Sequence, residues 1–475
     1  MRTAIAIALL FIAAAVGAST RNNDDSCDIG VYPAATLLLP YFEVETVTRG
    51  VDTFFTVTNV SPLPQIAHVT IWTDWSFPVL NFNLFLTGYD VQSISMYDVI
   101  VNGIVAPTNR NLTAGGTSSK TIPGTLSASN DANPSLSLAG CDQLPGILGF
   151  AVRAAMQSAL VTGTYNAPGF GPLGCGTTAV GSAAATHRTS TTAVGYVTID
   201  VTSACTATMP TNPSYFATEI LFDNVLIGEV QTLDKGPGSN FAGGNPMVHI
   251  RAIPEGGKAG TATPLPYTFY GRFINGQTIN GVPAIPHLDR RQPLGSTFAA
   301  RWIQGGTGFF STDFKIWREG VSGPVSCSNA ASNSALPVEE LERFDEHENP
   351  NTFLAGQLSC VPCPLPIILL PPTVRTSTAG GNFPSLNSPA GDSAGWMYLN
   401  LDSRKSNQLV NTILPARRAS QNWVVVSMTG AGSTAGLFGV EFDATSLGNG
   451  CSPPAGISPA IGGITFIGPA PNANP

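Results

Sequence analysis

The pattern Gly391-Asp392-Ser393-Ala394-Gly395 matches G-x-S-x-G, the motif that places a nucleophilic serine on a tight strand-to-helix turn in α/β-hydrolases. In those enzymes the histidine base follows the serine along the chain, whereas the last histidine here, His347, precedes Ser393. The residues after the motif, Trp396 to Leu401, alternate like a strand. We therefore expect a turn that leads into a strand, and we predict no catalytic residue.

Cysteine is the second residue type that could do chemistry. Cys360 and Cys363 form a C-x-x-C pair, but Pro362 and Pro364 exclude the helix that lowers the thiol pKa in redox motifs. A zinc site would need a second pair of this kind, and the sequence has none. The even number of cysteines predicts disulfide bonds in an exported chain, with the pairing left open. The disulfide candidates are Cys27, Cys141, Cys175, Cys205, Cys327, Cys360, Cys363 and Cys451.

Acidic side chains gather between Glu339 and Glu348. Carboxylate oxygens at close spacing suit Ca²⁺ in extracellular modules, so Asp345, Glu346 and Glu348 are the candidate metal ligands, although EF-hand spacing is missing. The alternative is the solvated face of a short helix over 337–347, and the sequence favours it. No other cofactor is indicated.

The five histidines are scattered and form no metal-binding pair. His68 and His249 lie in strand-like runs, where packed side chains are expected. His287, next to Asp289, Arg290 and Arg291, belongs to the most polar local group. That group suits an anion or a sugar, but a salt bridge in a surface loop is the favoured interpretation.

The tryptophans either form an exposed platform on which sugars stack or pack in the core. Trp72 and Trp75 differ in parity, so a regular strand would place them on opposite faces. Core aromatics are therefore the favoured interpretation for the whole set. Its members are Trp72, Trp75, Trp302, Trp317, Trp396 and Trp423.

The N-terminus is typical of a secretory signal peptide. Arg2 is followed by an apolar run, Ala4 to Val16, and by small residues that predict cleavage after Ala18. The apolar stretch near the C-terminus is interrupted by Gly and Pro, so we expect no integral membrane segment after cleavage. The predicted location is periplasmic, cell-surface or secreted.

Composition narrows the class of protein further. Charged residues make up 11%, against about 25% in typical domains, so Ser, Thr, Asn, Gln and Gly must cover the surface, as in many extracellular β proteins. The apolar content of 43% excludes general disorder. A net charge of -8 without a basic patch excludes nucleic acid and a polybasic membrane site as partners.

Period-two alternation of β-branched and aromatic residues predicts half-buried strands along most of the chain. Without regular helices between the strands, the pattern favours an all-β fold, an antiparallel β-sandwich that is either one large or two packed sandwiches, with one wet face per sheet. The clearest segments are Thr53–Val60, Ala67–Trp75, Phe82–Leu86, Tyr196–Thr202, Trp423–Met428 and Leu437–Phe442.

Two helical insertions and long loops interrupt the strands. Pro145 to Val161 is bounded by an N-terminal proline and by Gly163, which predicts a helix. Pro337 to His347 spaces Val338, Leu341 and Phe344 three apart, which predicts a second. The segments 106–140 and 166–195 are rich in small polar residues and predict loops.

The expected domain organisation has four parts. A signal peptide spans 1–18, and an N-terminal β-sandwich region that contains the helix near 145–161 spans 19–235. A C-terminal β-rich region spans 236–455, after a Gly-rich boundary at 236–244, and a Gly/Pro-rich tail spans 456–475.

Several phrases together resemble an uncharacterised group of exported bacterial proteins. The resemblance implies export and a bacterial source, and it carries no activity and no catalytic residues. The phrases are LLLPYFEV at 37–44, AHVTIWTDW at 67–75, TGYDV at 87–91, GYVTIDV at 195–201, RRQPLGSTFAARWI at 290–303 and RFDEHENP at 343–350.

The sequence therefore favours a secreted or cell-surface, non-enzymatic β protein with a structural, adhesion or ligand-binding role, whose partner is a glycan or a surface protein. The alternative is a secreted carbohydrate-binding or carbohydrate-active protein. Its paired carboxylates could lie far apart in sequence, because their separation is set only by the fold.

Overall fold

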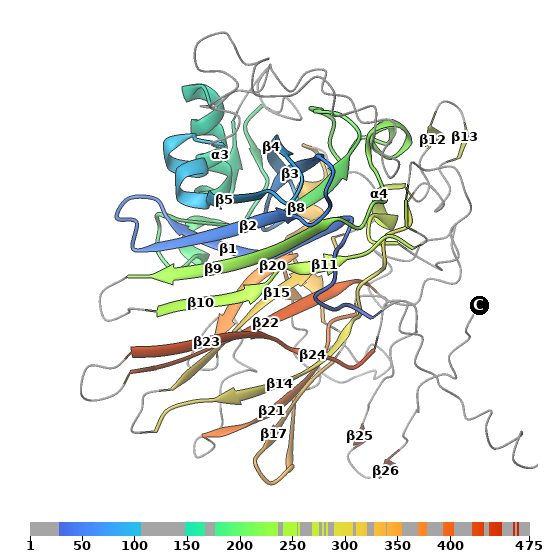
Figure 1. The fold of residues 1–475 in the computed structure, drawn as a ribbon. Helices are drawn as coiled ribbons and strands as arrows, with labels where there is room; N and C mark the ends of the chain where they lie inside the picture. The colour runs from blue at the N-terminus through green and yellow to red at the C-terminus, as the bar shows by residue number, and fades with distance from the viewer. Residues whose placement is uncertain are drawn as a thin grey trace, which may run out of the picture.

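In the residues that the computed structural model describes, β-strands predominate and form several antiparallel sheets packed together (Figure 1). This confirms the all-β prediction. The described residues are 28–105, 148–166, 176–235, 241–253, 255–256, 268–274, 278–279, 282–283, 289–306, 310–320, 327–338, 340–353, 369–377, 393–402, 420–431, 437–448, 459–460 and 463–464.

Two sheets form the N-terminal sandwich. Sheet I has the strand order β10-β9-β2-β5, and sheet II has the order β11-β1-β8-β3-β4. The strands are β1 (Thr36–Glu45), β2 (Val51–Asn59), β3 (Gln65–Thr73), β4 (Pro78–Leu86), β5 (Val91–Ser95), β8 (Thr192–Thr202), β9 (Leu226–Asp234), β10 (Phe241–Pro246) and β11 (Val248–Ile250).

Two further sheets form the C-terminal sandwich. Sheet III has the order β20-β15-β22-β23, and sheet IV has the order β18-β17-β21-β14-β24. The strands are β14 (Thr297–Ile303), β15 (Ser311–Arg318), β17 (Glu340–Asp345), β18 (Pro350–Phe353), β20 (Thr373–Ser377), β21 (Ala394–Asn400), β22 (Asn422–Ala431), β23 (Leu437–Asp443) and β24 (Thr445–Ser446).

Short elements connect these sheets. The helices are α3 (Phe150–Thr162) and the one-turn α4 (Gly271–Ile274), with single π or 3₁₀ turns at Asp98–Asn102, Ala184–Thr186, Tyr215–Glu219 and Ala330–Asn333. The two-stranded pairs are β6 (Thr164–Tyr165) with β7 (Thr178–Ala179), β12 (Thr278–Ile279) with β13 (Val282–Pro283), β16 (Leu336–Pro337) with β19 (Leu369–Leu370), and β25 (Pro459–Ala460) with β26 (Gly463–Ile464).

The strand pairing changes from one sandwich to the other after β11. β10 begins within the Gly-rich boundary expected near 236–244 and β11 lies beyond it, yet both pair with N-terminal strands. The first strand of the C-terminal sandwich is β14. The connection between the sandwiches therefore runs from 251 to 296, and it includes α4.

The predicted helix near 145–161 is present as α3. It ends at Gly163, whose φ of 70° is the left-handed conformation that favours glycine. Ala155 and Ala159 of this helix are buried in the core. The predicted loop at 106–140 lies outside the described residues, whereas the loop predicted over 166–195 already contains the start of β8.

The predicted helix over 337–347 is wrong, because Glu340–Asp345 form strand β17 of sheet IV. The alternation of apolar and polar residues was not recognised in this segment, because one inward position of the strand is an arginine. Arg343 is fully buried next to Leu341, and its guanidinium lies 5.2 Å from the ring centre of Trp302. An arginine that packs in this way reads as a surface residue in a hydrophobicity pattern.

A β-bulge in β1 sets which side chains face which core. The register of β1 against β8 shifts between Leu39 and Phe42. Leu37 and Leu39 point into the core of the N-terminal sandwich before the shift, and Phe42 and Val44 do so after it. The shift leaves Glu43 on the opposite face of sheet II.

That opposite face packs against the C-terminal sandwich. One hydrophobic core is shared by sheets II, III and IV, and it includes Leu38 and Trp72 of sheet II with Phe314 of sheet III. A column of rings crosses the junction, since Trp72 stacks on Tyr196 at 5.6 Å and Tyr196 meets Trp317 at 5.9 Å. Most of the tryptophans are therefore core aromatics, as predicted.

Because both faces of sheet II are covered, the expected wet face of these strands is wrong. Asp200, Thr198 and Thr202 of β8 were expected to face water, and each is at most 2% exposed. A buried carboxylate is tolerated only when other groups satisfy it. Asp200 is satisfied by segments that lie between the main strands.

The group that satisfies this carboxylate, here named the Asp200 cluster, comes from four parts of the chain. Asp200 accepts hydrogen bonds from Thr36 Oγ1 at 2.5 Å, Tyr215 Oη at 2.8 Å and Tyr270 Oη at 2.7 Å. Arg291 Nε lies 3.6 Å from Asp200 Oδ1 and also donates to Thr36. These contacts tie the connection between the sandwiches to the centre of sheet II.

The charges of this cluster are fixed by its surroundings. Burial and the nearby Asp200 charge raise the pKa of Tyr215 and Tyr270 well above the usual value, so both phenols stay protonated donors. Burial opposes the charge on Arg291, but Asp200 and Asp289 raise its pKa above the usual value. Asp289 and Arg291 are both completely buried, so the surface-loop salt bridge expected for this segment is wrong.

The two sandwiches also meet along two edge strands. β10 of sheet I runs beside β23 of sheet III (Figure 1). Asp443 of β23 accepts hydrogen bonds from Asn245 Nδ2 at 2.8 Å and from Trp423 Nε1 at 2.9 Å. Burial raises the pKa of Asp443 to about 6 in spite of these bonds.

Cys205 and Cys327 are the two cysteines among the described residues, and both are disulfide-bonded. The other six disulfide candidates, including the Cys360/Cys363 pair, lie outside the described residues. Within the part of the chain that the structure describes, no helix combines the length and the apolarity that crossing a bilayer requires.

Replacing Arg291 should destabilise the fold strongly, because Asp200 would lose its counter-charge in a fully buried site. We expect Arg291→Met to lower the free energy of unfolding by about 3–5 kcal/mol. The matched control is Arg301→Met, which removes the exposed pair with Glu346 and should cost less than about 1 kcal/mol. Denaturant unfolding of the full chain measures both, and equal losses would contradict the assignment.

Asp443 should make stability depend on pH. Its folded-state pKa of about 6 lies above the usual 3.8, so protonation favours folding, and this contribution is lost as the pH rises through about 6. Asp443→Asn should therefore stabilise the chain by up to about 3 kcal/mol near pH 8 and hardly at all below about pH 4. The exposed Glu348→Gln serves as control, and a pH-independent effect of Asp443→Asn would refute the argument.

Candidate functional site

A cleft of about 660 Å³ lies where the two sandwiches meet. This volume falls within the range of roughly 300–1,000 Å³ that is usual for ligand sites. The N-terminal sandwich contributes Tyr41, Asp74, Ser182, Thr186, His187, Arg188 and Val194. The C-terminal sandwich contributes Ser311, Asp313, Ser334, Leu369, Leu370, Pro371, Thr373, Val374, Arg375, Thr376, Ser377 and Thr429.

Ionic contacts between the sandwiches form one wall of this cleft. The group, here named the Arg375 cluster, consists of Glu43, Arg188, Asp234, Asp313 and Arg375. Arg375 donates to Glu43 Oε2 from Nη1 at 2.8 Å and to Asp313 Oδ2 from Nη2 at 2.5 Å. Glu43 belongs to β1 and Arg375 to β20, so this pair joins sheet II to sheet III.

Arg188 extends the Arg375 cluster toward sheet I. Its Nη2 lies 2.6 Å from Asp234 Oδ2, and its Nη1 lies 3.8 Å from Glu43 Oε1. Glu43 and Asp313 are almost fully buried, whereas the Arg375 side chain is 29% exposed. The carboxylates therefore support the guanidinium groups, which form the accessible part of the wall.

The electrostatic surroundings fix the charges of this wall. Burial opposes the charge of Arg375, but Glu43 and Asp313 raise its pKa well above the usual value. Burial and the Glu43 charge raise the pKa of Tyr41 well above the usual value, so its phenol stays neutral. Because each guanidinium faces a carboxylate, the wall presents little net charge to a ligand.

The floor on the N-terminal side is built by Asp74, Ser182 and His187. Asp74 accepts the backbone N–H of Ser182 at 3.0 Å, and Ser182 Oγ accepts Trp75 Nε1 at 3.1 Å. Burial raises the pKa of Asp74 above the usual value. The Ser182 hydroxyl thus accepts from an indole N–H, and its side-chain hydrogen bond to Asp74 lowers the pKa of that carboxyl against the effect of burial.

His187 has one ring nitrogen in use. Nδ1 lies 2.8 Å from the carbonyl oxygen of Thr192, and because a carbonyl only accepts, Nδ1 must carry the proton. Nε2 has no hydrogen-bond partner among the described residues. No hydroxyl group of the described cleft is therefore paired with the imidazole of His187, the arrangement by which a serine–histidine pair activates a nucleophile.

The rest of the lining is polar but uncharged, with an apolar strip. The hydroxyl groups come mainly from β20 and from the segments that face it, including Ser311, Ser334 and Thr429. The strip is formed by Val194, Leu370 and Val374. Hydroxyl groups both donate and accept hydrogen bonds, so such a lining suits a neutral ligand with mixed polar and apolar surface.

The three calcium candidates do not form a metal site. Asp345 accepts hydrogen bonds from the side-chain amide and the backbone N–H of Asn349 and from the N–H of His347, and these bonds lower its pKa. Glu346 binds Arg301 at 2.7 Å. Asp345 ends β17, and Glu346 and Glu348 lie in the turn that leads to β18. No group of three possible metal-binding side chains occurs among the described residues.

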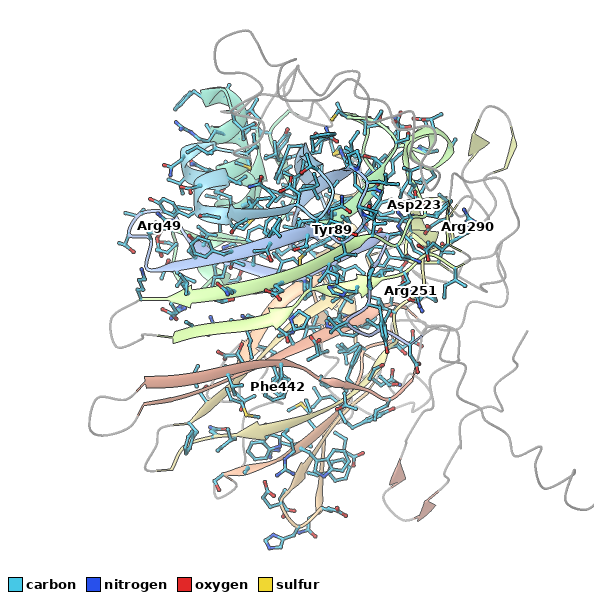
Figure 2. The ribbon with its side chains drawn as sticks, in the orientation of Figure 1. Arg49, Tyr89, Asp223, Arg251, Arg290 and Phe442 are labelled. Atoms are coloured by element: carbon cyan, nitrogen blue, oxygen red, sulfur yellow. The ribbon has the colours of Figure 1, made fainter. Side chains whose placement is uncertain are left out.

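The remaining candidates have structural positions. His68 and His249 are buried, as predicted. Ser393 directly precedes β21, which confirms the strand predicted after the motif, and Gly391 and Asp392 lie outside the described residues. The group around Arg290 lies at the connection between the sandwiches, where Figure 2 shows Arg290 beside Asp223; His287 lies outside the described residues.

Sequence reasoning missed the cleft because its charged residues lie far apart. Glu43 and Arg375 are separated by 332 positions. One signal was available: the chain has few charges, and Glu43, Lys315 and Arg375 lie inside strand-like segments. Lys315 pairs with Glu441 in the same junction. Charges within strands of a low-charge chain indicate buried ionic contacts between elements.

A scan of protein-family models, a search of curated proteins and a search of solved structures find nothing that matches this chain. The resemblance to exported bacterial proteins stays a prediction. The functional argument therefore rests on the geometry of the cleft and on the chemistry of its lining.

Proposed function

We propose that this is an exported, non-enzymatic β protein that binds a ligand in the cleft between its two sandwiches. The observation that carries the proposal is the cleft itself, a cavity of about 660 Å³ whose wall is held in place by ionic contacts from both sandwiches. The signal-like N-terminus and the low charge content support an extracytoplasmic location.

The lining supports binding more than catalysis. General acid–base work needs a group that can gain or lose a proton near neutral pH. The Arg375 and Tyr41 side chains are held in single protonation states, since their pKa values are raised well above the usual values. The Ser182 hydroxyl faces an indole. These groups can position a ligand, but they do not activate one.

A carbohydrate ligand is the second candidate. The many hydroxyl groups of the lining favour it, because they match the hydrogen-bonding groups of a sugar. Protein sites for sugars also use exposed aromatic faces, and Tyr41, the one aromatic side chain of the described lining, is 7% exposed. Most of the described aromatic residues of the chain are buried in the core.

Filling the cleft should abolish binding whatever the ligand is. The probes are a glycan array and a display library of random 12-residue peptides, each applied to the full chain. Thr186→Trp and Ser334→Trp place an indole in the cleft from opposite sandwiches, so we expect each to weaken any binding at least about tenfold.

The matched control is Ser93→Trp, which adds the same bulk to the exposed face of β5 outside the cleft. Its binding should equal that of the unmodified chain. Binding that survives both cleft variants would move the site elsewhere. The absence of any binding to either probe would count against a ligand-binding role.

A further inference from the structure

The cleft follows the edge of β20, not its face. Five consecutive residues, Thr373 to Ser377, line it. Successive side chains of a strand point to opposite faces, so a cavity that touches all of them must lie along the strand edge. β20 is the last strand of sheet III, and no other described strand pairs with its outer side.

The hydrogen bonds of β20 show which backbone groups point into the cleft. In an antiparallel pair, alternate residues direct both their N–H and C=O groups to the neighbouring strand. The carbonyl of Pro372 accepts the N–H of Arg318 at the end of β15, so Pro372 faces β15. By alternation Val374 and Thr376 also face β15, and Thr373, Arg375 and Ser377 direct their backbone groups outward.

The N-terminal sandwich already uses the first of these outward groups. The N–H of Thr373 donates to the carbonyl oxygen of Asp74 at 3.0 Å. This bond confirms the outward direction of Thr373, and it places a backbone carbonyl where an added strand would continue. The span from Thr373 to Ser377 is about 13 Å at 3.3 Å per residue, which fits a partner strand of four or five residues.

We propose that the cleft binds a short, uncharged, extended segment of polypeptide that adds as a strand to the outer edge of β20. This inference rests on the proposed ligand-binding role of the cleft. Strand addition of this kind takes its affinity from backbone hydrogen bonds and its selectivity from side-chain pockets on either side. The outward N–H and C=O groups of Arg375 and the outward carbonyl of Thr373 supply the bonds.

The lining selects the composition of the bound segment. Arg375 is already engaged by Glu43 and Asp313, so a charged ligand would have to break these buried pairs. The apolar strip with Val194 and Leu370 can contact aliphatic side chains of the bound segment. Hydroxyl groups such as those of Ser334 and Thr429 can form hydrogen bonds with small polar side chains of the segment. Neutral residues that alternate between aliphatic and small polar types therefore fit best.

The backbone pattern favours a peptide over a sugar. A sugar would use the hydroxyl groups of the lining but not a row of outward N–H and C=O groups with strand spacing. It would also lack an aromatic face to stack on within the described lining. The edge of β20 offers the one feature of the cleft that only another strand can use fully.

The test uses peptides selected from the display library on the full chain. Each backbone N–H of a selected peptide is then methylated in turn, which removes one donor without changing the protein. We expect methylation to weaken binding about five- to tenfold at every second position and to be tolerated in between. Such a period of two is the signature of strand pairing.

Variants of the chain test the other side of the same bonds. Arg375→Ala removes the side chain and keeps the outward N–H, whereas Arg375→Pro removes both. An edge strand tolerates proline where its N–H makes no bond to the neighbouring strand. We expect Arg375→Pro to bind at least about fivefold more weakly than Arg375→Ala, with equal far-ultraviolet circular dichroism as the check on folding.

The outcomes separate this inference from the proposed function. Peptides that bind in the cleft without the period of two overturn strand addition and leave the ligand-binding role. Glycans that bind and are lost in Thr186→Trp, without any selected peptide, also overturn strand addition alone. If every peptide or glycan that binds the unmodified chain also binds the two cleft-filling variants, both proposals fail.

Discussion

A buried carboxylate at the centre of sheet II, that of Asp200, constrains the arrangement of the whole molecule. Leaving such a group unpaired away from water costs several kcal/mol, which is a large part of the stability of a typical domain. The chain meets this constraint by bringing Tyr215, Tyr270 and Arg291 to the same point. Each comes from a connecting segment, so the path between the sandwiches is fixed by one acid.

The junction of the sandwiches has two different ends as a result. At one end, aromatic rings such as Trp72, Tyr196 and Trp317 pack against one another and leave a cavity of only about 10 Å³. At the other end, the junction is ionic and surrounds the cleft. Rings fill space, whereas guanidinium groups must stay at fixed hydrogen-bond distances from their carboxylates. The larger cavity, of about 660 Å³, therefore lies beside the Arg375 cluster.

Local patterns in the sequence predicted the elements well. The alternation at 53–60, 67–75 and 196–202 corresponds to β2, β3 and β8, and the segment before Gly163 is a helix. These predictions succeeded because one strand or helix is defined by its own residues. The segment 337–347 failed because Arg343 takes an inward position, where its cation packs on Trp302.

Relations between distant elements were not predictable in the same way. The alternation of β8 is equally compatible with water and with a second sandwich over its polar face. Only the fold shows that Asp200 is covered and that Arg291 reaches it. The cleft has the same origin, since Glu43 and Arg375 meet across 332 positions. Charges inside the strands of a low-charge chain were the one available sign.

The pairing of the few charged side chains also limits which interactions the cleft can make with a ligand. The carboxylates and guanidinium groups of the Arg375 cluster are engaged with one another, and pairing with Glu43 and Asp313 outweighs burial and holds Arg375 in its charged state. Groups that are satisfied within the protein give a rigid wall, which lowers the entropic cost of binding but leaves little capacity for proton transfer. The hydrogen-bonding capacity that remains lies in the backbone edge of β20 and in the hydroxyl groups around it. A wall of this kind can recognise a partner by shape and by main-chain pattern, and this capacity is the physical basis of the proposed binding role.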